Sequence, residues 1–96
     1  MKINEPQLFL EINDLKFVFL VIKYNENFDF NILDSTIVDS KGVLDGKIID
    51  LETSSKIIKQ NLYTIEKKID YTFKKITIIN TQSDYNCINV SGFKKL

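Results

Sequence analysis

Residues 50–69 decide the fold, and they read DLETSSKIIKQNLYTIEKKI. Side chains of one stripe recur at spacings of three and four residues, at Leu51, Ser55, Ile58, Leu62, Ile65 and Ile69. This period places them along one side of an α-helix. Asp50 is a suitable N-cap because its carboxylate can accept from the amides of the first turn, although residues 53–55 compete for that position. The stretch therefore predicts a single long amphipathic helix that packs on a sheet.

Three apolar segments precede this helix, at Gln7–Ile12, Leu15–Lys23 and Phe28–Leu33. In the first and third, apolar and polar residues alternate, which is typical of strands with one solvated face. The second is almost continuously apolar, and we expect it to be buried on both faces. Asn13-Asp14 and Asn25-Glu26-Asn27 separate the segments, and both have turn composition. The first third of the chain therefore predicts a three-strand meander.

Further strands are predicted on both sides of the helix. Short extended passages at 43–44 and 47–49 lie beside turn-forming glycines, and the segments Lys75–Asn80 and Tyr85–Val90 follow the helix. A polar turn at 81–84 separates these last two strands. We therefore expect an α+β fold. Its N-terminal three-strand meander is followed by a strand–helix–strand–strand unit, with one main helix packed on a sheet.

The composition limits the chemistry of the chain. Its 96 residues contain 13 basic and 13 acidic side chains, every basic one is a lysine, and there is no histidine. The zero net charge provides no field to attract nucleic acid. Without histidine or arginine the usual general base and the bidentate phosphate clamp are missing, and no phosphate-binding glycine motif occurs. We therefore expect neither an enzyme nor a nucleic-acid binder, with no metal site.

The cellular location of the chain is indicated by its cysteine content and by the length of its apolar segments. Cys87 cannot form an internal disulfide, so we expect a reducing, cytoplasmic setting and a structural thiol rather than a nucleophile. The first six residues lack the apolar core of a signal peptide. The longest apolar run, Phe17–Ile22, is too short to cross a bilayer. Direct membrane insertion is not expected.

Two groups of side chains need an interpretation. Asp45 and Asp50 flank a short strand, and we interpret them as a solvated turn and a helix cap rather than as an acid–base pair. Tyr63, Tyr71 and Phe73 either fill the interface between sheet and helix or form an exposed aromatic patch. The first interpretation is favoured, because core packing is the commoner role of aromatic residues.

A resemblance to a known family is carried by Ser40–Glu52, which reads SKGVLDGKIIDLE. This segment resembles the S-[KR]-G-[ILV]-x-x-G-x-[IV]-x-[DN]-[IL]-E stretch of the bacterial cell-division FtsA family, which leads into a helix. Upstream, Glu11–Lys16 falls where that actin-like family carries Asp-Ile-Gly-Thr-Ser-Lys. The resemblance covers most of the chain, although only residues 42–52 are fairly specific.

The resemblance implies two regions and a setting. Residues 1–39 would be the first strands of an actin-like domain, and residues 40–96 would be the strand–helix–strand–strand insert of the family. That insert contributes to filament contacts and docks later division proteins, at the membrane-associated division site. The full-length parent binds ATP, and it binds FtsZ and the membrane through regions that are absent here. Expected partners are other division proteins or copies of the chain itself, so a homo-oligomer is implied.

Asn13, Asp14 and Lys16 occupy the place of the family's first phosphate loop. The glycine and hydroxyl residues of that loop are replaced here, and a carboxylate repels a phosphate. Either this loop has lost phosphate binding, or the turn is an ordinary hairpin. In both cases we expect no cofactor for this chain alone.

The sequence therefore favours a protein–protein interaction or assembly module of an FtsA-like division protein. One alternative is an incomplete piece of an actin-like ATPase, including pilus-assembly relatives, whose nucleotide site needs further domains. Another is an unrelated small α+β binding protein. An unpaired edge strand is a suitable contact surface, and we expect self-association through the first three strands.

Overall fold

One helix, one sheet and a small hairpin make up the computed structural model, which describes residues 4–80 and 83–89. The expected α+β class is confirmed. In chain order the elements are β1 (Gln7–Ile12), β2 (Lys16–Tyr24), β3 (Phe30–Asp39), β4 (Val43–Leu44), β5 (Lys47–Ile48), α1 (Leu51–Ile69), β6 (Lys75–Asn80) and β7 (Ser83–Asn89). The predicted helix is confirmed, and Asp50 rather than residues 53–55 is its N-cap, although Leu51 of the predicted stripe is 55% exposed.

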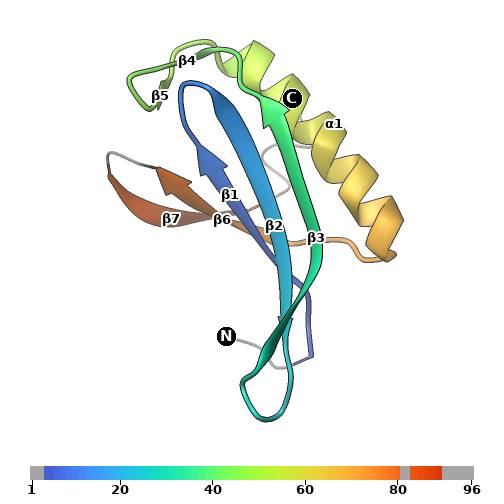
Figure 1. Cartoon of the computed structure of the whole chain (residues 1–96). Coiled ribbons are helices and arrows are strands. Elements are labelled where there is room, and N and C mark those ends of the chain that lie inside the picture. The colour runs from blue at the N-terminus through green and yellow to red at the C-terminus, as the bar shows by residue number, and fades with distance from the viewer. Residues whose placement is uncertain (1–3, 81–82, 90–96) are drawn as a thin grey trace.

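The five-stranded sheet has the order β3-β2-β1-β6-β7. β1, β2 and β3 form the expected antiparallel meander, whereas β6 lies parallel to β1 and antiparallel to β7. Because β3 and β6 are parallel and lie on opposite sides of the β1–β2 pair, the chain needs a long connection between them, and α1 provides it. Figure 1 shows α1 running along the sheet near β3, with the β4–β5 hairpin beside the tip of the β1–β2 hairpin.

A single sheet runs through both regions that the resemblance implies. β1 belongs to residues 1–39 and β6 to residues 40–96, yet they pair from Leu8↔Ile76 to Ile12↔Asn80. The helix of the second region also covers the strands of the first. Strands from both regions therefore share one sheet and one core.

The core lies between α1 and the sheet face that we call the inner face. Apolar side chains from alternate positions of β1, β2 and β6 meet the helix stripe there, with exposures of 9% or less. They are Leu8, Leu10, Ile12, Phe17, Phe19, Val21, Ile58, Leu62, Ile65, Phe73, Ile76 and Ile78. Near the start of the helix, the buried side chains are those of Ser54 and Ser55 instead of apolar residues.

The third strand differs from its prediction. It starts at Phe30 rather than Phe28, because Phe28 has φ 62° and belongs to a turn in which the Asn25 side chain accepts from the amides of Asn27 and Asp29. It also continues to Asp39. The expected burial of its alternate aromatic and Ile residues is wrong, since Phe30 and Ile32 are 57% and 60% exposed.

Two further expectations are only partly met. Phe17, Phe19 and Val21 of β2 are fully buried on the inner face, but Val18 and Leu20 on the opposite face are only half-buried. The last strand begins at Ser83, inside the predicted turn, and Val90 lies outside the described residues. The side chain of Cys87 also lies outside what the structure describes.

Candidate protein-interaction surface

The hairpin between β1 and β2 contains the three residues predicted at a phosphate-loop position. The Asn13 Oδ1 atom accepts from the backbone amides of Leu15 and Lys16, at 2.9 and 2.7 Å. The Lys16 ammonium group reaches across the sheet to the Asp39 carboxylate at the end of β3. Asn13 therefore closes the hairpin, and Lys16 ties β2 to β3.

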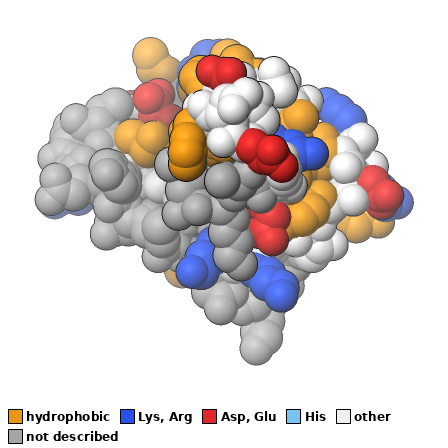
Figure 2. All heavy atoms as spheres, turned by 90° about the horizontal axis from the view of Figure 1, so that it is seen from below, with side chains coloured by type: hydrophobic (Ala, Val, Ile, Leu, Met, Phe, Trp, Pro, Cys, Tyr) orange, Lys and Arg blue, Asp and Glu red, His pale blue; other side chains and the backbone are white. Residues whose placement is uncertain are grey.

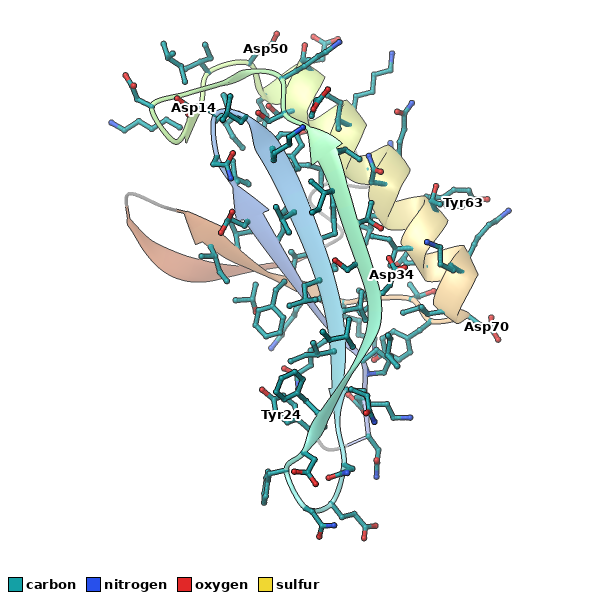
Figure 3. The ribbon with its side chains drawn as sticks, viewed as in Figure 1. Asp14, Tyr24, Asp34, Asp50, Tyr63 and Asp70 are labelled. Carbon is teal, nitrogen blue, oxygen red and sulfur yellow. The ribbon has the colours of Figure 1, made fainter. Side chains whose placement is uncertain are left out.

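Asp14 points to a different part of the molecule (Figure 3). Its two carboxylate oxygens accept from the amides of Asp45 and Gly46, at 3.0 and 2.7 Å, in the turn of the β4–β5 hairpin. Charged acceptors form the stronger kind of hydrogen bond. The carboxylate thus joins two hairpins that lie about thirty residues apart in the chain, and it faces backbone donors of its own chain.

Each informative residue of the Ser40–Glu52 segment has a local structural role. Gly42 has φ 79°, and a Cβ added there would lie 2.6 Å from the Asp50 carbonyl oxygen, so only glycine fits. Gly46 has φ 75°. Asp50 caps the helix by accepting from the hydroxyl and amide of Thr53, at 2.7 and 3.1 Å, and these bonds lower the pKa of Asp50. The segment therefore specifies two left-handed turns and a cap.

The three aromatic residues divide between the two interpretations left open. Phe73 is buried, and the Tyr71 ring packs edge-on against it at 5.1 Å. Tyr63 is instead 58% exposed beneath the Lys67 ammonium group, 4.8 Å from the ring centre. A shallow hollow here is lined by Tyr63, Glu66, Lys67, Asp70, Tyr71 and Thr72. The Glu66 carboxylate accepts from the Phe73 amide at 2.8 Å and so stabilises the turn that follows the helix.

The face of the sheet opposite α1, which we call the outer face, is mainly apolar. Cross-strand partners point to the same face, so the strand register identifies its members. Its apolar residues are Phe9, Val18, Leu20, Ile22, Tyr24, Phe30, Ile32, Ile37 and Ile79. Ile32, Ile37 and Ile79 are exposed, at 60%, 61% and 38%. Figure 2 looks at the molecule from below, and there the described part of the surface has hydrophobic side chains between charged ones.

A bulge in β3 brings Ile32 and Ile37 to the same face. Val21 pairs with Asp34 but the next residue of β2, Ile22, pairs with Ile32, so Leu33 is an extra residue. Without it, two positions five apart would point to opposite faces. The sequence gives no clear signal for this face, because Ile37 is followed directly by apolar Val38, and the bulge changes which residues share a face.

β3 also directs backbone groups away from the sheet along its edge, where the Ser35 amide interacts with the Asp34 carboxylate of the same chain. The Ser40 amide donates to the Leu15 carbonyl at 3.1 Å, and in an antiparallel pair bonded and non-bonded residue pairs alternate. The backbone groups of residues 34, 36 and 38 therefore face β2. Those of Ser35, Ile37 and Asp39 point away from the sheet, and these are outer-face positions.

The charges of β3 are already paired within the chain. The Asp34 carboxylate accepts from the Lys68 ammonium group at 3.0 Å and from the Thr36 hydroxyl at 2.8 Å. Burial raises the pKa of Asp34, but the bonds from Lys68 and Thr36 outweigh it, and the net pKa is lowered. Asp39 has the Lys16 ammonium group beside it, which lowers the pKa of Asp39 too. β3 contains neither proline nor lysine, the residues that usually protect an edge.

Comparison with known proteins adds no relative. No protein-family model matches the chain, and a search of curated proteins finds no significant match. Within residues 4–80 and 83–89 no group of three or more potential metal ligands occurs, and no helix there is both long and apolar enough to cross a membrane. The exposed Ile32 and Ile37 side chains and the outward-pointing backbone groups make the outer face and the edge of β3 the candidate functional surface.

Proposed function

We propose that this chain is a protein–protein interaction and assembly module that docks a partner strand on β3 and apolar side chains on the outer face. The observation that carries the proposal is the coincidence of two features on the same residues. Ile37 presents a 61% exposed apolar side chain, and its backbone groups point away from the sheet. A strand added at this edge satisfies the backbone groups and covers the side chain together.

The energetics favour this use of the surface. Full burial of one large aliphatic side chain stabilises by about 1.5–3 kcal/mol, and Ile32 and Ile37 each have more than half of theirs exposed. An edge strand without a partner is also a template for unwanted pairing. Docking therefore converts an exposed edge into a paired one.

A photo-crosslinking experiment in the source cells tests the docking role. p-Benzoylphenylalanine is placed at Ile37 in one strain and at Ile49 in a second, because Ile49 is similarly exposed at 67% but lies in the loop before α1. We expect protein adducts from position 37 and far fewer from position 49. Equal labelling at both positions, or none at 37, contradicts docking at β3.

We also propose that this chain docks its partner without binding a nucleotide. This expectation is supported by the hydrogen bonds of Asn13 and Asp14, whose side-chain oxygens accept from backbone amides of the chain itself. Isothermal titration of the chain with magnesium-ATP is expected to give no binding heat. Micromolar binding instead favours the alternative, part of an actin-like ATPase whose site needs further domains.

For the cellular context we propose an FtsA-like division protein, supported by the Ser40–Glu52 resemblance. The local roles of Gly42, Gly46 and Asp50 favour the competing interpretation, an unrelated α+β binding protein, because any hairpin that leads into a helix needs such turns. A fluorescent fusion in the source cells separates the two. Accumulation at the division site supports the FtsA-like context, and an even distribution supports the unrelated module.

A further inference from the structure

We infer that the strand docked on β3 is β3 of a second copy of this chain, paired antiparallel about a two-fold axis at Ile37. This inference rests on the proposed docking role of β3 and names its partner. A self-complementary contact of this kind closes as a dimer, the commonest symmetric assembly.

The bulge at Leu33 sets the register. From Asp34 to Ser40 the pairing of β3 with β2 is regular, and Leu33 interrupts it. A two-fold axis at Ile37 lies in the middle of this regular stretch and keeps the bulge out of the new ladder. It also pairs only residues whose backbone groups point outward, namely Ile37 with its own copy and Ser35 with Asp39 of the second copy.

The side chains fit this register. The two Ile37 side chains meet on the outer face, and each is already beside Val18 in its own sheet. An apolar row then crosses the interface from one sheet into the other. In the flanking row, Ser35 lies opposite Asp39 of the second copy, so a hydroxyl meets a carboxylate and the two Asp39 groups stay apart.

Charge favours a second copy over a basic peptide. Both carboxylates of β3 already have lysine partners in their own chain, Asp34 with Lys68 and Asp39 with Lys16. A basic strand would have to compete with these lysines. Two copies of this chain also carry no net repulsion, because its formal charge is zero.

Disulfide trapping tests the register. In a Cys87→Ser background, Ile37→Cys places two thiols in a hydrogen-bonded pair, where the Cα atoms are about 5.5 Å apart and within the range of a disulfide. Mild oxidation is expected to link Ile37→Cys dimers. Ser35→Cys and Asp39→Cys are expected to link poorly alone but readily when mixed, with Ile49→Cys as the exposed control. If Ile37→Cys links no faster than Ile49→Cys, the two-fold register is overturned.

Sedimentation equilibrium tests the dimer itself. We expect Ile37→Lys to weaken self-association at least about tenfold, equivalent to about 1.4 kcal/mol. The matched Ile49→Lys change should have no effect. Circular dichroism checks that each variant is folded. The inference is overturned if the wild-type chain is monomeric at high concentration. It is also overturned if Ile49→Lys weakens self-association and Ile37→Lys does not.

The outcomes separate this inference from the proposed function. Photo-crosslinks from position 37 to a different protein, with a monomeric purified chain, reject the second copy and keep the docking role. No crosslinks and no self-association reject both. Crosslinks between two copies of this chain, together with the dimer, support both.

Discussion

At the scale of single residues, the carboxylates of Asp14, Asp34 and Asp50 act as acceptors for donors of the chain itself. Asp14 holds the β4–β5 turn, Asp34 receives Lys68 and Thr36, and Asp50 caps the helix. A carboxylate that is occupied in this way is fixed in position and is not available to a substrate. The hydrogen bonds of these three carboxylates therefore support the fold.

Asp14→Ala should destabilise the chain by about 1–2 kcal/mol, because the amides of Asp45 and Gly46 lose their acceptor. Urea unfolding followed by circular dichroism measures the change. Glu26→Ala is a suitable control, since Glu26 is exposed in the turn between β2 and β3. An effect of Asp14→Ala no larger than that of Glu26→Ala would show that the hairpin contact contributes nothing.

The lowered pKa of Asp34 predicts a pH dependence of stability. A carboxyl group whose folded pKa lies below its unfolded value, about 3.9, contributes stability above that pH and loses it as the pH falls through the folded pKa. Asp34→Asn should therefore flatten the fall in stability below about pH 4. Urea midpoints from pH 7 to pH 2 measure this, with Asp29→Asn in the exposed turn as the control. Parallel curves for wild type and Asp34→Asn would contradict the pairing with Lys68.

At the scale of elements, local patterns were predictable and the irregular edge was not. The helix follows from a three–four period with a cap, both readable within about twenty residues, and β1 and β6 follow from short apolar segments. β3 was predicted too short and with Phe30 and Ile32 buried. The cause is the bulge at Leu33, which shifts the alternation between its two halves and depends on pairing with β2. The candidate surface was missed in detail for the same reason.

The end of α1 provides a stabilising prediction. Asp70 follows the helix with φ 55°, a left-handed conformation that costs any residue but glycine, and its charge lies at the negative end of the helix dipole. Asp70→Gly should stabilise by about 0.5–1 kcal/mol. Asp70→Asn removes only the charge, so the difference between the variants isolates the backbone effect. Thermal unfolding measures both, and a lower melting temperature for Asp70→Gly would contradict the argument.

At the scale of the whole molecule, the helix α1 covers one side of the sheet, and residues 4–80 and 83–89 place no helix on the other side. The second strand of the meander was predicted to be buried on both faces because Leu15–Lys23 is almost continuously apolar. The structure buries its inner residues under α1 and leaves Val18 and Leu20 half-buried on the outer face. A single sequence shows how apolar a strand is. It does not show which face of the sheet is buried, because that depends on the face on which the helix packs. The surplus apolar face is the property that a docking module needs.

If two copies pair through β3, unfolding becomes coupled to dissociation, and stability must depend on protein concentration. Any contact made only by the folded chain raises stability with the concentration of its partner. Over roughly a hundredfold range of concentration, the melting temperature of the wild type should therefore rise by several degrees. Ile37→Lys should abolish the rise, while Ile49→Lys, an identical change at a similarly exposed position, should preserve it. Melting curves by circular dichroism in cells of different path length measure this directly. A melting temperature of the wild type that is independent of concentration would mean that the outer face and the β3 edge serve a different partner.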